Sequence, residues 1–228
     1  MTRRVEIFKL NQGQIKLTKD LKINSEIRYS FCRLSTLLLY KFTHQIYSRL
    51  LNPTNISLAN AIVDMEAGPY AAEYLAWNFN SGMAAIDACL SNVLSHGDVL
   101  IVSRNVYGGV YQLLHDYFAR SNRMDIQIAW FDGYDAQSFA EFMQQTKTEH
   151  ASRLSNGAKM HVYLESPCNP HGYVLDVPGI CELAHAQDAL VMLDSTLATP
   201  VLHQPLQHKN KAARHKSRLN KKVKALSA

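Results

Sequence analysis

The chain has 228 residues, of which 47% are hydrophobic and 19% charged, and this composition is typical of a soluble globular protein with one sizeable α/β domain or two small ones. Its apolar runs, such as residues 34–40, are too short to span a bilayer. No apolar segment of the kind found in secretory signals follows the first arginines. Four scattered cysteines without a Cys-x-x-Cys pair indicate a reduced, cytoplasmic setting. The ten histidines lack metal-ligand spacing, so we expect no metal site.

The net charge of +5 is unevenly distributed along the chain. Residues 1–51 carry ten Lys and Arg against three Asp and Glu, residues 52–206 carry six against sixteen, and residues 207–228 carry eight against none. This pattern predicts a divergent N-terminal segment (1–51), a folded core (52–206) and a basic, disordered tail (207–228). Because the core is acidic, its surface is not that of a nucleic-acid-binding domain.

From residue 52 onward, helical periodicity alternates with short β-rich runs. The expected helices cover residues 57–68, 81–98, 108–121, 136–150 and 176–188, and the expected strands cover residues 99–103, 125–131, 158–166 and 189–193. Gly97 is expected to end the second of these helices. Residues 1–46 show no clean period. Four strands separated by helices predict a parallel sheet with helices on its faces, and the site of such a sheet lies at the carboxyl ends of its strands.

Four positions stand where such a site would lie, and each allows two interpretations. The Ser-Gly turn that ends at Gly82 opens a helix, which suits a phosphate or serves only as a cap. Tyr107, before two glycines, could lie against a flat ligand or pack in a turn. Asn169, in a turn with two prolines, could bind a ligand oxygen or brace the turn. Asp194 ends an apolar strand, where it could keep a heterocyclic nitrogen protonated or accept hydrogen bonds from the adjacent Ser-Thr backbone.

Five motifs, four of which contain these positions, occur in a fixed order, with a strand and a helix between successive members: YSRLLNPT, NSGMAAI, VYGGVY, ESPCNPHG and DSTLATP. Together they resemble the Cys/Met-metabolism (transsulfuration) family of pyridoxal-phosphate enzymes, which includes cystathionine γ-synthase, cystathionine β- and γ-lyases and methionine γ-lyase. The resemblance covers residues 47–207. It implies a fold type I large domain, with a mostly parallel sheet between helices that is incomplete at its C-terminal end.

The resemblance also implies the cofactor, pyridoxal 5′-phosphate, and the substrates, which are sulfur amino acids such as cystathionine. The implied reaction is C–S lysis or γ-replacement, in a homo-oligomer (dimer or tetramer) that does not involve a membrane. Tyr47 and Arg49, in the N-terminal segment, would reach the cofactor phosphate of the neighbouring subunit. The backbone N–H groups of Gly82 and Met83 would hold the phosphate bound in their own subunit.

The remaining implied roles concern the cofactor ring. Tyr107 would stack on the ring and take part in proton transfer, which makes it the candidate catalytic residue. Asn169 would bind the ring's phenolic oxygen, Asp194 would pair with the pyridinium nitrogen, and Thr196 would lie close to the ring.

The sequence departs from the family pattern after residue 206. In the family, a lysine that forms a Schiff base with the cofactor follows the aspartate in a Ser-x-Thr-Lys motif, and this motif does not occur here. We therefore expect a chain truncated before the Schiff-base lysine, inactive or impaired as an enzyme. The alternatives are a non-catalytic remnant and a binding protein that uses its basic tail.

Overall fold

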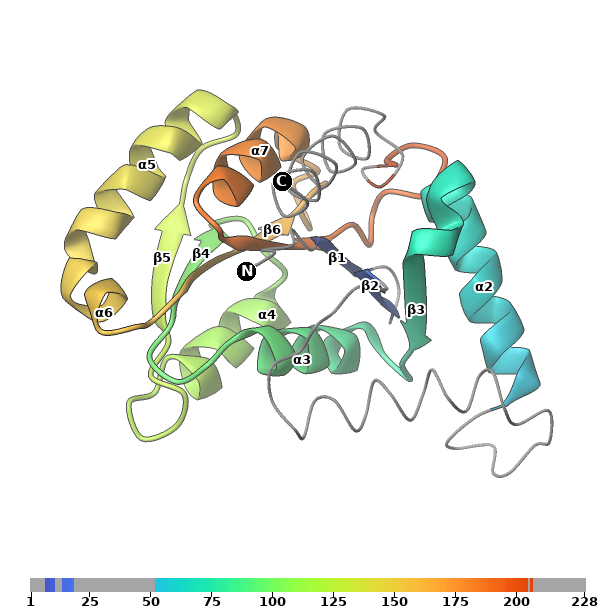
Figure 1. Cartoon of the computed structure of the whole chain (residues 1–228), viewed down its shortest axis with the longest axis horizontal. Coiled ribbons are helices and arrows are strands. Elements are labelled where there is room, and N and C mark those ends of the chain that lie inside the picture. Colours follow the sequence, from blue (N-terminus) through green and yellow to red (C-terminus); the bar gives the residue numbers. More distant parts are fainter. Residues whose placement is uncertain (1–6, 11–13, 19–51, 205, 207–228) are drawn as a thin grey trace, which may run out of the picture.

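The computed structural model describes residues 7–10, 14–18, 52–204 and 206. A seven-stranded sheet runs through this part of the chain in the order β3-β2-β1-β7-β6-β4-β5 (Figure 1). Its four expected strands are parallel neighbours, and their observed bounds are β4 Val99–Ser103, β5 Gln127–Phe131, β6 Met160–Glu165 and β7 Leu190–Asp194.

Three further strands extend the sheet beyond β7. They are β1 Ile7–Leu10, β2 Gln14–Thr18 and β3 Tyr74–Asn78. Strand β1 is parallel to β7, with Leu10 opposite Asp194, whereas β2 is antiparallel to both β1 and β3. None of these strands was predicted, and β1 covers the side of β7 that faces away from β6.

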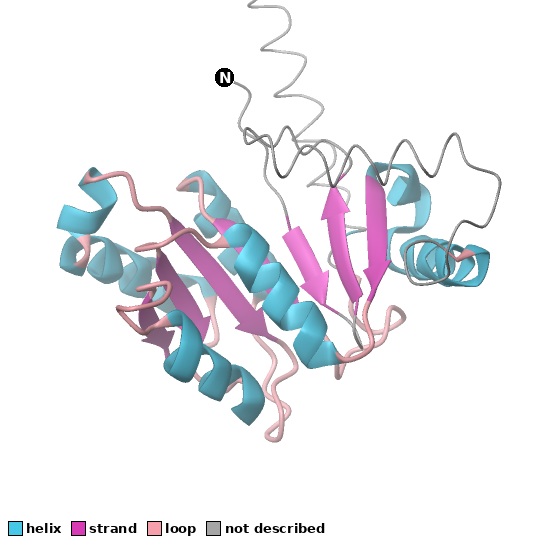
Figure 2. Cartoon of the chain, turned by 90° about the horizontal axis from the view of Figure 1, so that it is seen from below, coloured by secondary structure: helices cyan, strands magenta, loops and turns pink. Residues whose placement is uncertain are grey.

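Helices cover both faces of the sheet (Figures 1 and 2). Helices α3 and α4 lie on one face, α5 and α7 lie on the other, and α2 lies beside β3. The observed bounds are α2 Pro53–Ala67, α3 Gly82–Val93, α4 Gly108–Leu113, α5 Ala136–Glu149, α6 Ala151–Ser155 and α7 Val177–Ala186. The 3-10 helix η1 Gly68–Glu73 follows α2, and the π-helical turn η2 Leu114–Phe118 continues α4.

Alternation along the central strands creates two separate cores, because successive side chains of a strand point to opposite faces. The core against α3 and α4 contains Leu100, Val102, Tyr163 and Met192. The core against α5 and α7 contains Ile101, Val162, Leu164 and Leu193. A strand with helices on both faces reads as a continuous apolar run, which is why β4, β6 and β7 were predicted from the sequence.

Side-chain caps fix where the main helices begin. Ser81 caps α3 by accepting a hydrogen bond of 3.1 Å from the Ala84 N–H, and Asp135 and Asp176 cap α5 and α7 in the same way. A cap of this kind stabilises a helix by about 1 kcal/mol. Because α3 follows β3 directly, its N-terminus lies at the edge of the sheet where the parallel strands end.

The predicted C-terminal end of α3 was wrong. Helix α3 ends at Val93 with Leu94 at its C-cap, and not at Gly97. Gly97 instead has φ +82° in the turn before β4, where its N–H donates to the Met124 carbonyl oxygen at 2.9 Å. This positive φ favours glycine, so Gly97 serves the turn before β4 and does not cap the helix as predicted. The expected tail, residues 207–228, lies outside the described residues.

The two-sided sheet predicts a large cost for shortening a side chain in a central strand. Leu164, in β6, is fully buried, and we expect Leu164→Ala to lower the free energy of unfolding by about 2–5 kcal/mol, since it removes apolar contacts and leaves a cavity. Urea unfolding followed by circular dichroism measures this change. Val174→Ala is the control, because Val174 is 66% exposed and its truncation is expected to cost less than about 0.5 kcal/mol. Equal effects of the two substitutions would contradict the assignment of the core.

Candidate active site at the carboxyl ends of the strands

Two carboxylates lie side by side where the central strands end. Glu165 is the last residue of β6, Asp194 is the last residue of β7, and the register places them directly opposite each other. Their side chains are only 3% and 4% exposed. Both belong to the face that carries α3 and α4, because Tyr163 and Met192, two residues earlier, lie in that core.

Asp194 accepts three hydrogen bonds from the protein. Its Oδ1 accepts from the Thr196 hydroxyl at 2.7 Å and from the Thr196 N–H at 3.0 Å, while its Oδ2 accepts from the Tyr163 hydroxyl at 3.2 Å. The bond to the Ser-Thr backbone, one of the two interpretations of Asp194, is therefore present. An ionised carboxylate has about four acceptor positions, so Oδ2 can accept one more donor.

The tyrosine beside Asp194 is held in its neutral form. Burial raises the pKa of Tyr163 well above its usual value, and the negative charge of Asp194 raises it further. Burial and the same charge also raise the pKa of the Cys89 thiol, on α3. Tyr163 is thus a permanent hydrogen-bond donor to Asp194, and the carboxylate lies in an environment that favours a positively charged partner.

The N-terminus of α3 meets Tyr107 at Gly109. A Cβ atom placed on Gly109 would lie 2.7 Å from Cε1 of Tyr107 and 3.2 Å from the sulfur of Met83, so a larger residue here would have to displace the Tyr107 ring. Tyr107 is the N-cap residue of α4 and remains 48% exposed, so its ring is available to a ligand. The first N–H groups of α3, from Gly82 and Met83, have no carbonyl partner within the helix and can hold an anion.

Glu165 joins the loops that carry two other predicted residues. Its Oε2 accepts a hydrogen bond from the Tyr107 N–H at 2.7 Å, and its Oε1 accepts one from the Asn169 N–H at 2.8 Å. The side chains of Asn169 and Thr196 are exposed at this edge. The structure therefore brings Gly82, Met83 and Tyr107 together, and it links Tyr107, Asn169 and Asp194 through β6 and β7.

The predicted residues Tyr47 and Arg49 lie outside the described residues. Among the lysines whose side chains the structure describes, neither lies at this edge. Lys147, near the end of α5, donates to Gln187, and Lys159 precedes β6 at the opposite edge of the sheet. Where side chains are described, the site thus contains no lysine that could bind a cofactor covalently.

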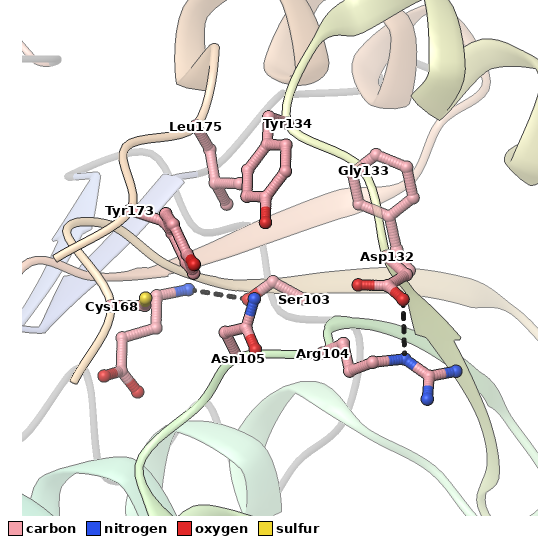
Figure 3. A pocket seen from close by; sticks show the side chains of 11 residues that line it. Ser103, Arg104, Asn105, Asp132, Gly133, Tyr134, Cys168, Tyr173 and Leu175 are labelled. Carbon is pink, nitrogen blue, oxygen red and sulfur yellow. Dashed lines mark hydrogen bonds and ion pairs between the residues drawn. The ribbon is translucent and has the colours of Figure 1, made fainter. Parts of the chain in front are cut away.

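A small hollow opens beside Glu165, with a volume of about 240 Å³ that is partly open solvent. Figure 3 shows Tyr134 and Tyr173 on one side of it and the Arg104–Asp132 ion pair, 3.5 Å long, on the other. Both charged side chains of the pair are more than half exposed, so the pair contributes little to stability. Its lining includes Ser103, Asn105, Cys168 and Leu175.

Two further features are absent from the described part of the chain. In the described ranges, no group of three or more His, Cys, Asp and Glu side chains is arranged to hold a metal ion. None of the helices that the structure describes has the length and apolar composition needed to cross a bilayer.

Comparison with known proteins identifies the family. The model of the Cys/Met metabolism PLP-dependent enzyme family matches residues 20–214, and the chain belongs to this family. The resemblance inferred from the five motifs is therefore confirmed.

Relatives of known name agree with this assignment. Cystathionine beta-lyase of Lactococcus lactis subsp. cremoris (strain MG1363) is 34% identical over 164 residues, which are 70% of this chain and 37% of the relative. L-methionine gamma-lyase of Fusobacterium nucleatum subsp. polymorphum is 31% identical over 166 residues, which are 71% of this chain and 36% of the relative. The chain thus spans little more than a third of the length of these relatives.

A solved structure shows the same fold. The cystathionine gamma synthase of Xanthomonas oryzae pv. oryzae, in complex with cystathionine, superposes with a TM-score of 0.56 and 28% identity. The match covers 73% of this chain and 38% of that one. The expectation of a fold type I α/β domain is confirmed.

Glu165 and Tyr163 are two residues of the site that were not predicted from the sequence. Glu165 belongs to the ESPCNPHG motif and ends an apolar run, which is the same signal that singled out Asp194. Tyr163 precedes Glu165 by two residues, and the period of a strand places both on one face. The pairing of Tyr163 with Asp194 could not be predicted, because it depends on which strand lies next to β7.

The buried carboxylate of Glu165 predicts a pH dependence of stability. Burial raises the pKa of Glu165 to about 7, the two backbone N–H bonds lower it in part, and the charge of Asp194 raises it. The folded state therefore keeps a proton that the unfolded state loses near pH 4.5, so the free energy of unfolding falls as the pH rises from about 4.5 to about 7. We expect this contribution to be about 1–2 kcal/mol after allowance for solvent screening.

Urea unfolding of the wild type and of Glu165→Gln at a series of pH values isolates this contribution. The difference in stability between the two proteins should change across the interval from pH 4.5 to 7 and be level on either side. A difference that does not vary with pH would show that Glu165 ionises normally in the folded chain.

Proposed function

We propose that this chain binds pyridoxal 5′-phosphate at the carboxyl edge of its sheet, as part of an enzyme that cleaves or exchanges C–S bonds of amino acids such as cystathionine. One observation carries the proposal: a buried carboxylate, Asp194, shares this edge with the N-terminus of a capped helix and with a half-exposed tyrosine. A carboxylate, anion donors and an aromatic face are the three groups that a phosphorylated pyridine requires. When bound, this cofactor acts as an electron sink that stabilises negative charge at the substrate's α-carbon.

Asp194 would set the protonation state of the ring nitrogen. Its carboxylate is buried, and it forms no ion pair with a basic side chain among the described residues. Thr196 and Tyr163 orient it through hydrogen bonds. A protonated ring nitrogen would be the positive partner that such a carboxylate favours. Thr196, fixed by Asp194, would lie close to the ring.

Gly82 and Met83 would hold the phosphate with their N–H groups, assisted by the positive end of the α3 dipole. Tyr107 would lie against the ring, because its own ring borders Gly109 and Met83. The Tyr107 hydroxyl would move a proton at the substrate, which is its proposed catalytic role. Asn169 would donate from its side-chain amide to the ring's phenolic oxygen.

The proposal has a finer part, which concerns the lysine that binds the cofactor covalently in the family. Without a Ser-x-Thr-Lys motif, we propose that cofactor binding by this chain is non-covalent and that its turnover is impaired. We also propose that the protein acts in the cytoplasm as a homo-oligomer, in which Tyr47 and Arg49 would reach the phosphate of a neighbouring subunit. The family resemblance of the YSRLLNPT motif supports this second part.

Removing the charge of Asp194 tests the site directly. We expect Asp194→Asn to weaken the binding of pyridoxal 5′-phosphate by roughly tenfold or more, since a charge-assisted hydrogen bond to the ring nitrogen is lost. Titration followed by the absorbance of the cofactor measures the affinity. Asp132→Asn is the control, because this exposed carboxylate pairs only with Arg104 among the contacts described. Equal affinities of the wild type and Asp194→Asn would contradict the proposed role.

Borohydride reduction tests the absence of a covalent link. We expect wild-type protein that is saturated with the cofactor, reduced and then denatured to release it, with no lysine-containing peptide carrying the added mass. Mass spectrometry of a tryptic digest provides the measurement. A single modified lysine between residues 209 and 224 would overturn the proposal and identify a lysine that serves in place of the expected one.

A further inference from the structure

Among the residues whose burial is described, Glu165 is the one buried carboxylate at this edge to which the proposed function gives no role. It is 3% exposed, and each of its two oxygens accepts a hydrogen bond from a backbone N–H. Its own N–H donates to the Ser103 hydroxyl at 3.1 Å, so the backbone of β6 is also bonded to the end of β4. Both bonds to the carboxylate are short, at 2.7 and 2.8 Å, as is typical of charge-assisted hydrogen bonds.

The two N–H groups come from separate loops. Tyr107 is in the loop after β4, 58 residues before Glu165, and Asn169 is in the turn after β6. Neither side chain is buried, although the Tyr107 ring borders Gly109 and Met83, so packing fixes these two residues only in part. The Tyr107 carbonyl also accepts the N–H groups of Val110 and Tyr111, so the first turn of α4 is tied to the same residue. The carboxylate of Glu165 therefore links both loops to the end of β6.

We propose that Glu165 is a positioning residue, which holds the backbones of Tyr107 and Asn169 at the spacing at which their side chains meet the cofactor ring. This inference rests on the proposed function for the identity of the ligand. The hydrogen bonds between Glu165 and the two loops are independent of that function. Glu165 acts through Tyr107 and Asn169, while the phosphate position at Gly82 and Met83 does not depend on it.

The requirement is for a carboxylate and not only for a polar side chain of this size. Two N–H donors need two acceptors, and a glutamine amide offers one oxygen and one NH₂ group. In Glu165→Gln, the NH₂ group would face a backbone N–H, so one of the two loops would lose its bond. The substitution keeps the volume of the side chain and leaves no cavity.

The chain contains a matched control at the opposite edge of the sheet. Asp98, which precedes β4, is 2% exposed and also accepts two backbone N–H bonds, at 2.8 Å from Ser95 and at 2.7 Å from Lys159. Its loops carry none of the proposed cofactor contacts. The buried His161 also lies against Asp98, with its Nε2 3.5 Å from Oδ2. Asp98→Asn thus removes an acceptor of a backbone N–H at the opposite edge of the sheet, with an added effect on His161, and a defect confined to the cofactor edge would not appear in this variant.

The first experiment is hydrogen exchange on the cofactor-free protein, followed by mass spectrometry, at a pH above the Glu165 pKa of about 7, where the side chain is ionised. We expect Glu165→Gln to exchange faster than the wild type in the segment 104–111 or in the segment 167–173, and Asp98→Asn to match the wild type in both. Unchanged exchange of Glu165→Gln in both segments would overturn the inference. This result is independent of the cofactor, so it remains decisive even if the wild type fails to bind pyridoxal 5′-phosphate, which would refute the proposed function alone.

The second experiment compares two probes, pyridoxal 5′-phosphate and inorganic phosphate. Glu165→Gln should bind pyridoxal 5′-phosphate roughly tenfold more weakly than the wild type and inorganic phosphate equally well, because only the ring contacts are displaced. Asp98→Asn should match the wild type with both probes. Parallel losses for both probes, or equal losses in the two variants, would show a merely structural role and overturn the inference.

A third variant covers the case in which Glu165→Gln does not fold, as judged by circular dichroism. Glu165→Asp keeps the charge but shortens the side chain by one methylene, so its carboxylate cannot reach both N–H groups. It should reproduce the faster exchange in one of the two segments, whereas wild-type exchange in both would overturn the inference.

Discussion

The site depends on the burial of two neighbouring carboxylates. Glu165 and Asp194 end adjacent parallel strands in register, so both charges are removed from water at one edge of the sheet. A buried charge is costly unless donors surround it. The loops supply three of these donor residues, the backbone of Tyr107 and Asn169 for Glu165 and Thr196 for Asp194, while Tyr163 of β6 supplies the fourth. The hydrogen bonds to these carboxylates thus hold the loop backbones in place. The same loops carry the side chains that face a ligand.

Much of this arrangement could be predicted from the sequence, because the relevant signals are local. Asp194 follows an apolar run and Gly82 opens a periodic helix, so both positions were recognised before the strand order was known. The role of Glu165 was not recognised, because it consists of bonds to the backbone of Tyr107 and Asn169. A backbone N–H has no signature in the sequence, and the proximity of Tyr107 to Glu165 arises only when β4 and β6 become neighbours.

The strands that were missed have a related explanation. The core strands β4, β6 and β7 are covered by helices on both faces and read as apolar runs. Strand β3 is only partly buried, and β1 and β2 contain lysines between their apolar residues. Their pairing depends on β7 and on one another. These short segments of mixed composition are therefore strands because they form hydrogen bonds with neighbouring strands, and their own β-propensity does not predict them.

The position of the β1–β2 hairpin affects the order in which this chain can fold. Strands β4 to β7 are joined by local crossovers, whereas β3 reaches them only through β2 and β1. Residues 7–10 pair with residues 191–194, near the opposite end of the described chain. Closing such a long loop is entropically expensive, and contacts of high sequence separation slow folding. The edge that carries Asp194 would therefore be completed late, after β7 has been synthesised and while its unpaired side is still open to other chains.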